Sequence, residues 1–152
     1  MSKVDTAWSS LAPGVSGASD LKMEMTTQEL VDVIGRESYT VLSTIMSDTH
    51  DTILLRRCTE FGKVIKFHTD YSFKTLQVPL NGEHEYEGGR LVYATGRGLV
   101  RPQRPAGSYT LHRNDIAHGV TELKEGVRYG LFLLQKRAPS HHVSIPVGGE
   151  QW

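Results

Sequence analysis

The stretch VIKFHTDYSFKTLQVPLN, residues 64–81, holds two short runs of apolar, aromatic and β-branched residues on either side of a polar turn around Ser72. Such runs bounded by turn residues are typical of β-strands, and we expect strands at residues 64–69 and 75–80. Pro79 has no N–H group to donate to a neighbouring strand. The strand that contains it is therefore expected at a sheet edge or with a bulge.

Runs of the same kind lie on both sides of this stretch, separated by turn residues such as Gly62 and the Asn81-Gly82 pair. No segment between them is long enough to form the helix of a parallel crossover. Eight such strands are expected to close as an antiparallel sandwich or as a double-stranded β-helix (jelly roll). We expect the double-stranded β-helix, and in either case the fold is mainly β. The six further strands are expected at residues 39–45, 52–58, 91–95, 108–112, 120–123 and 127–135.

The N-terminal region predicts one short helix. Thr26 and Thr27 are suitable N-cap residues, apolar residues follow at helical spacing, and Gly35 ends the pattern. Residues 1–19 are rich in Ser, Gly and Ala and are expected to form a flexible arm. A chain of 152 residues fits one domain, which we place at residues 20–152, with an irregular tail that contains a strand at 142–145.

Composition excludes several classes of protein. The 17 Lys and Arg residues balance the 17 Asp and Glu residues, so no basic surface indicates nucleic acid or an anionic membrane as a partner. Cys58 is the only cysteine, which excludes a disulfide scaffold and a cysteine-rich zinc module. No run approaches the roughly 18 apolar residues of a membrane span, and the N-terminus does not have the pattern of a signal peptide. We therefore expect a cytoplasmic protein.

Three residues predict a metal site. His68 and Asp70 are two residues apart in a strand, so their side chains leave the same face and converge. His118 opens a later β run and is the candidate third ligand. Two imidazoles and one carboxylate on one face of an Fe(II) ion leave open positions for a co-substrate and dioxygen.

Arg128 indicates that the co-substrate is an anion. It lies ten residues after His118, and we expect its strand to run antiparallel to the His118 strand across the Glu125-Gly126 turn. Its side chain would then point into the barrel near the metal. A buried arginine requires an anionic partner, and a small dicarboxylate that chelates the metal at its other end supplies one.

Residues 53–134 resemble the Fe(II)/2-oxoglutarate-dependent oxygenases, particularly their prolyl-hydroxylase-like branch. The resemblance implies that His68, Asp70 and His118 ligate Fe(II), and that Arg128 binds the distal carboxylate of 2-oxoglutarate. It also implies conversion of 2-oxoglutarate and O2 to succinate and CO2. The motifs that carry it occur in the order FHTD (67–70), LQVPLN (76–81), YEGGRL (86–91), PAGS (105–108), HGV (118–120) and GVRY (126–129).

The chain departs from that pattern at the second anchor of the distal carboxylate. Many relatives have a tyrosine where this chain has Pro79, and others have a serine where it has Gly130. Gln77 and Thr75 lie on the same strand and are the alternative candidates for this role. The remaining histidines form no metal-ligand spacing and are interpreted as surface or turn residues: His50, His84, His112, His141 and His142.

Two functions follow from these residues. The first is a hydroxylase that acts on a peptide or protein side chain, or on an amino-acid-like substrate. The second is a non-redox jelly roll that uses the same site to bind a metal and a small acid or sugar. Arg128 favours the first, because a simple binding module does not need a cation at that position. Arg56 and Arg57 are adjacent on one strand, so one of them is expected to face inward and one outward. A solvent-facing pair at the rim of the sheet is the preferred interpretation, and contact of an inward arginine with an anionic substrate group is the alternative.

Overall fold

The computed structural model describes residues 20–59, 62 and 64–137. The expected arm at residues 1–19 and the expected strand at 142–145 lie outside this range. The described part of the chain contains eleven strands and two helices. Neither helix has the length and apolar character required to cross a membrane.

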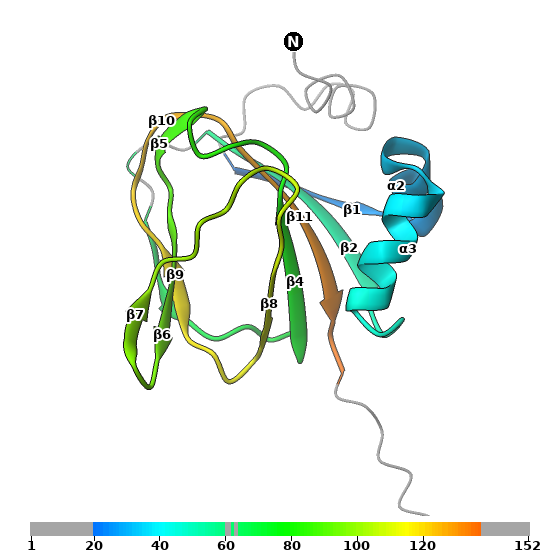
Figure 1. The fold of residues 1–152 in the computed structure, drawn as a ribbon. Coiled ribbons are helices and arrows are strands. Elements are labelled where there is room, and N and C mark those ends of the chain that lie inside the picture. The colour runs from blue at the N-terminus through cyan, green and yellow to red at the C-terminus, as the bar shows by residue number, and fades with distance from the viewer. Residues whose placement is uncertain (1–19, 60–61, 63, 138–152) are drawn as a thin grey trace, which may run out of the picture.

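Two antiparallel sheets lie face to face and form the body of the molecule (Figure 1). The larger sheet has the strand order β1 (Asp20–Met25), β2 (Thr52–Cys58), β11 (Arg128–Gln135), β4 (Lys74–Pro79) and β8 (Thr110–Arg113). The smaller sheet has the order β3 (Ile65–His68), β9 (His118–Val120), β6 (Leu91–Thr95) and β7 (Gly98–Val100). A separate pair joins β10 (Leu123–Gly126) to β5 (Tyr86–Gly88).

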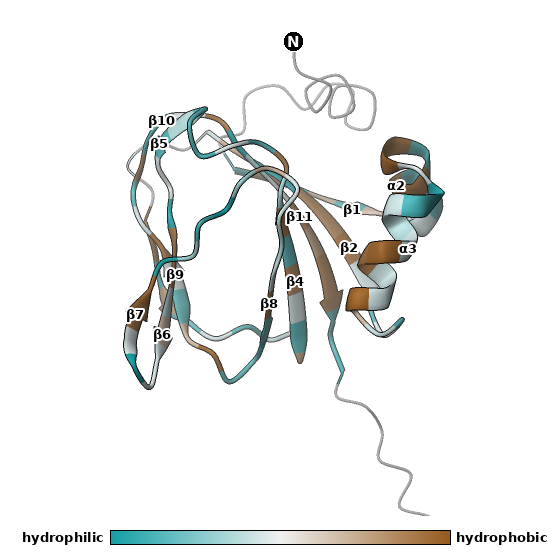
Figure 2. Cartoon of the chain, viewed as in Figure 1, coloured by the Kyte–Doolittle hydropathy of each residue, from teal (hydrophilic) through white to brown (hydrophobic). Residues whose placement is uncertain are grey.

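Helices α2 (Thr27–Ile34) and α3 (Arg36–Ile45) cover the outer face of the larger sheet, away from the smaller one (Figure 1). Burial alternates residue by residue along β11, so its two faces are different environments. The face toward the helices is the apolar core, and Figure 2 shows the hydrophobic residues of these strands and helices. The core residues include Met25, Leu30, Ile53, Leu55, Leu76, Val78, Leu131 and Leu133. The other face is available to line a cavity between the sheets.

The predicted N-terminal helix is confirmed. The Thr26 side chain accepts from the backbone N–H of Glu29, and the Glu29 carboxylate accepts from the backbone N–H of Thr26. Gly35 ends the helix with φ of 84°, a conformation that glycine adopts without steric cost.

The strand predicted at residues 39–45 is wrong, because this segment belongs to α3. Its β-branched and aromatic residues favour a strand locally. However, Tyr39, Leu42 and Ile45 are three residues apart, and as a helix the segment packs all three against the core of the larger sheet. Tertiary packing therefore overrides the local preference.

The two strands expected in residues 64–81 are confirmed as β3 and β4, but β4 is not an edge strand. Its pairing with β8 ends at Gln77 and Thr110, before Pro79 is reached. The N–H of Leu80 donates to Tyr129 on the β11 side, so the nitrogen of Pro79 faces the opposite side. Pro79 is tolerated there because no strand residue needs its N–H group.

The strand expected at residues 120–123 is also wrong, because two strands, β9 and β10, flank residues 121–122 and pair with different partners. The short strands β1, β5 and β7 were not predicted. The remaining expected strands correspond to β2, β6, β8 and β11 within a few residues.

Candidate metal centre

The register of the smaller sheet places two of the predicted ligands side by side. His68 on β3 pairs with His118 on β9, and Tyr93 on β6 pairs with His118 from the other side. These three side chains therefore leave the same face of the sheet. On the larger sheet, Thr75 of β4 pairs with His112 of β8. Asp70, two residues beyond β3, lies between these two rows.

The three predicted ligands come together. The Oδ1 atom of Asp70 lies 3.6 Å from Nε2 of His68 and 3.5 Å from Nε2 of His118. One ligand atom from each residue lies within 4.8 Å of the other two. Two imidazole nitrogens and one carboxylate oxygen at this separation match the donor set of a non-haem Fe(II) site. The residues present therefore fit an iron ion.

The second carboxylate oxygen of Asp70 has different partners. Its Oδ2 atom accepts from the Thr75 hydroxyl at 2.7 Å and lies 2.9 Å from Nε2 of His112. The Nδ1 atom of His112 is 3.0 Å from the hydroxyl of Tyr93. The interpretation of His112 as a surface or turn residue is therefore wrong, since it is buried inside the barrel. The sequence gives no signal for this position, because alternation along β8 would place the apolar Leu111 inward, whereas Leu111 is exposed and His112 is buried.

The charges around Asp70 favour metal binding. Burial raises the pKa of Asp70, but the hydrogen bonds from His112 and Thr75 and the charge of His118 outweigh that effect and lower it to about 2. Burial lowers the pKa of His118 below its usual value. At neutral pH the carboxylate is therefore ionised and the His118 imidazole is neutral, which are the forms that bind a metal ion.

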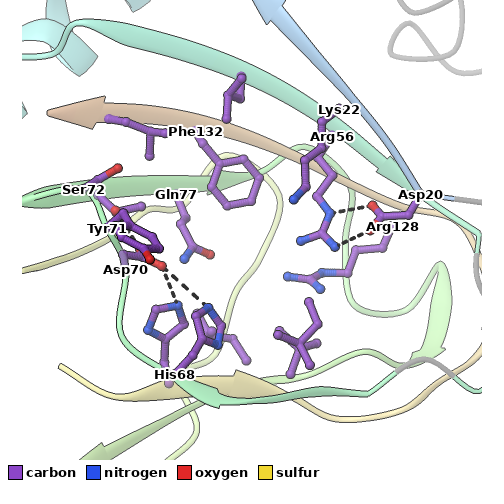
Figure 3. Close-up of a pocket in the computed structure, with 17 residues that line it drawn as sticks. Asp20, Lys22, Arg56, His68, Asp70, Tyr71, Ser72, Gln77, Arg128 and Phe132 are labelled. Atoms are coloured by element: carbon purple, nitrogen blue, oxygen red, sulfur yellow. Dashed lines mark hydrogen bonds and ion pairs between the residues drawn. The ribbon is translucent and has the colours of Figure 1, made fainter. Parts of the chain in front are cut away.

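A cavity of about 390 Å³ connects this centre to a basic region between the sheets. Figure 3 shows His68 and Asp70 at one end and Arg56 and Arg128 at the other, with Gln77 and Phe132 between them. The side chain of His68 is 44% exposed, whereas that of His118 is 5% exposed. The metal end of the cavity therefore opens to solvent on the His68 side.

Arg128 lines this cavity, as predicted, but it does not reach the cavity by the predicted route. β9 and β11 are not an antiparallel pair across the Glu125-Gly126 turn, because they belong to different sheets and β10 lies between them in the chain. Arg128 therefore faces the metal residues from the opposite wall. Burial and the nearby charge of Arg104 lower its pKa to about 10, so it remains a cation at neutral pH.

Arg56 is the inward-facing member of the adjacent arginine pair. Its Nε and Nη2 atoms donate to the two carboxylate oxygens of Asp20 at 2.7 and 2.8 Å. Arg104, in the link between β7 and β8, was not predicted, and no motif identifies it. It is 5% exposed, and its Nε atom has no hydrogen-bond partner among the described residues.

The two candidates for the second anchor differ in the structure. Gln77 is buried and lines the cavity between the metal residues and Arg128. Thr75 also lines the cavity, but its only hydroxyl proton is donated to Asp70. It therefore has no proton left to donate to a second carboxylate, and Gln77 is the better placed of the two.

No protein-family model and no curated protein matches the chain. Among solved structures, a Pseudomonas putida prolyl-4-hydroxylase is similar with a TM-score of 0.58 and 13% identity, over 90% of this chain and 86% of that one. A Burkholderia pseudomallei oxidoreductase of the 2OG-Fe(II) oxygenase family is similar with a TM-score of 0.62 and 14% identity, over 90% of this chain and 81% of that one. A prolyl hydroxylase from Trichoplax adhaerens, in complex with a hypoxia inducible factor peptide fragment, is similar with a TM-score of 0.64 and 14% identity, over 87% of this chain and 74% of that one.

At these identities the similarity concerns the fold. This structural similarity confirms the expected fold class. It also confirms, as a similarity of fold, the resemblance inferred from the motifs. The chain thus has the double-stranded β-helix fold that is found in prolyl hydroxylases and other 2OG-Fe(II) oxygenases.

Proposed function

We propose that this protein is an Fe(II)- and 2-oxoglutarate-dependent oxygenase that hydroxylates its substrate. One observation carries the proposal: a two-histidine, one-carboxylate centre and an arginine lie at opposite ends of a single cavity. A protein that only binds a metal ion and a neutral ligand does not need an arginine in this cavity. A 2-oxo dicarboxylate needs both ends, because one end chelates the metal and the other requires a positive charge.

His68, Asp70 and His118 hold the iron ion in this proposal. When bound, Fe(II) supplies the redox chemistry that couples decarboxylation of 2-oxoglutarate, to give succinate and CO2, to oxygenation of the substrate by O2. Because the protein would supply only three ligands, the bound ion would keep room for the 2-oxo acid and for dioxygen.

Arg128 orients the co-substrate. Its guanidinium group can donate two parallel hydrogen bonds to a carboxylate, which fixes direction as well as position. The Gln77 amide, between Arg128 and the metal residues, is the proposed second anchor. The basic end of the cavity therefore receives the distal carboxylate and directs the 2-oxo acid end to the metal.

The proposed substrate is a peptide or protein side chain, or an amino-acid-like molecule. The metal end of the cavity lies near the surface, where Tyr71 on its rim is fully exposed and His68 is partly exposed. An open rim of this kind accepts a side chain presented by a larger molecule. The Trichoplax structure, which contains a bound peptide, supports this class of substrate.

The test is succinate formation. The purified protein is incubated with Fe(II), 2-oxoglutarate and O2 in the presence of peptide and amino-acid pools, and His118→Ala serves as the inactive control. We expect metal-dependent succinate and a product that gains one oxygen atom from labelled O2. Binding of metal and dicarboxylate without succinate formation would instead support the non-redox binding module.

A further inference from the structure

The two carboxylate oxygens of Asp70 are divided between two environments. Oδ1 faces His68 and His118 at 3.6 and 3.5 Å, where the proposed metal is held. Oδ2 is on the other side, within 2.7 Å of the Thr75 hydroxyl and 2.9 Å of His112 Nε2. A carboxylate held in this way presents one oxygen to the metal position and has the other occupied.

The direction of these hydrogen bonds follows from the chemistry of the groups. An ionised carboxylate only accepts, so the proton must be on Nε2 of His112. In the neutral imidazole Nδ1 is then an acceptor, and the Tyr93 hydroxyl at 3.0 Å is its donor. Asp70 therefore fixes the tautomer of His112, and the Tyr93 hydroxyl supports that tautomer by donating to Nδ1.

His112 is not placed as a fourth ligand. The group of possible ligand atoms within 4.8 Å of one another contains His68, Asp70 and His118, and does not include His112. The His112 side chain is 3% exposed, and its position is set by the pairing of β8 with β4. The imidazole therefore belongs to the wall of the site and acts on the metal position through Asp70.

We propose that His112, oriented by Tyr93, is a positioning residue that holds Asp70 as a one-oxygen ligand. This inference rests on the proposed metal centre. Were both oxygens to bind, Asp70 would take two octahedral positions and the protein four in total. Only two positions would then remain for the 2-oxo acid and dioxygen, which together need three. The Tyr93–His112 pair therefore protects the position that dioxygen requires.

The experiment uses the metal-free protein titrated with Co(II), whose visible absorption intensity reports coordination number. His112→Leu removes the donor to Asp70, His112→Gln keeps an N–H donor, and Tyr93→Phe removes the hydroxyl that donates to Nδ1 of His112. His84→Leu, which changes an exposed histidine outside the site, is the matched control. Circular dichroism and urea unfolding verify that each variant is folded.

We expect His112→Leu to weaken Co(II) binding about 10- to 100-fold and to change its absorption intensity, as is usual when a group that supports a ligand is lost. His112→Gln should restore most of the affinity and the parent spectrum, whereas Tyr93→Phe should give an intermediate spectrum. A parent-like spectrum and affinity in His112→Leu overturns the inference, and so does a failure of folded His112→Gln to restore them.

Failure of the proposed function gives a different result. If the parent binds Co(II) and the His112 variants behave as expected, but no succinate is formed with Fe(II), then the oxygenase proposal fails and the positioning role stands. If the parent binds no Co(II), the metal centre and the role of His112 are both overturned.

Discussion

His118 is the most enclosed of the three proposed metal ligands, because its side chain is 5% exposed and its Nδ1 atom lies 3.2 Å from the carbonyl oxygen of Ile116. That hydrogen bond leaves Nε2 without its proton and directed at Asp70. His118→Ala should therefore lose most of the metal bound by the parent, since two ligands do not define a face of the octahedron. Metal analysis after equilibration with Fe(II) tests this. His84→Ala is the control, and full occupancy in both variants would exclude His118 as a ligand.

Arg128 is the residue on which co-substrate affinity is expected to depend. Arg128→Met leaves the distal carboxylate without its cation in a partly buried site, a loss of roughly 3 kcal/mol, or about a hundredfold in affinity. Anaerobic titration of the Fe(II) protein with 2-oxoglutarate measures this directly. Metal binding should be unchanged, as in the control Arg97→Met, which changes an exposed residue. Equal affinity for 2-oxoglutarate in Arg128→Met and the parent would show that the arginine is structural.

Asp70 gives a pH-dependent contribution to stability in the metal-free protein. Hydrogen bonds and the charge of His118 outweigh burial and lower its pKa from 3.8 to about 2. Because the folded value is the lower one, the stabilisation is present above the unfolded pKa and is lost as the pH falls from about 5 to about 2. The shift corresponds to about 2 kcal/mol.

Urea unfolding with a chelator present should therefore show Asp70→Asn less stable than the parent at pH 7, by an amount that shrinks between pH 5 and pH 3. The exposed Asp115→Asn is the matched control, for which a constant difference is expected. A parent–variant difference for Asp70 that does not change over this range would contradict the assignment.

At the scale of elements, α2 depends on its N-terminal cap. The Thr26 hydroxyl accepts from Glu29 N–H at 3.2 Å, and the Glu29 carboxylate accepts from Thr26 N–H at 2.7 Å. Thr26→Ala removes the cap and should lower the free energy of unfolding by about 1 kcal/mol. Thr40→Ala, in the exposed interior of α3, is the control and should be neutral or slightly stabilising, because alanine has the higher helix propensity. Urea unfolding compares the two, and an equal effect would argue against the cap.

The three-residue spacing of Tyr39, Leu42 and Ile45 explains why α3 is helical although its composition favours a strand. The five-stranded sheet needs a cover for its outer apolar face, and a helix presents these side chains together. A strand would place Leu42 on the opposite side from Ile45. The need to cover the outer face of the larger sheet therefore decides that this segment is a helix.

At the scale of the whole molecule, the larger sheet separates two functions. Its outer face forms the core with the helices, and its inner face lines the cavity. Leu133 is fully buried on the outer side, and Leu133→Ala should destabilise the protein by about 2–5 kcal/mol. Leu99→Ala, at a residue 71% exposed, is the control and should have little effect. At temperatures where it is folded, Leu133→Ala should still bind metal with the affinity of the parent. A loss of metal affinity in the folded variant would show that the two faces of the larger sheet are coupled.

The sequence by itself determined the features that depend on local spacing. His68 and Asp70 share a side because they are two residues apart, and Thr26 caps α2 because Glu29 follows at the required distance. The strand-like runs without a crossover helix were sufficient to predict an antiparallel, mainly β fold, and the order of motifs from residue 67 to residue 129 supported the β-helix and the choice of Arg128. These last predictions depend on patterns along the chain, whereas the first two are contacts between near neighbours.

Tertiary structure alone decided the features that depend on register between distant strands. His112 contacts Asp70 only because β8 pairs with β4 so that Thr75 and His112 are opposite each other, 37 positions apart in the sequence. Arg128 reaches the cavity from the sheet opposite His118, although the two are ten residues apart. The physical reason is the same in both cases: hydrophobic burial on one face of a sheet sets its register, and the register then determines which polar side chains meet on the other face.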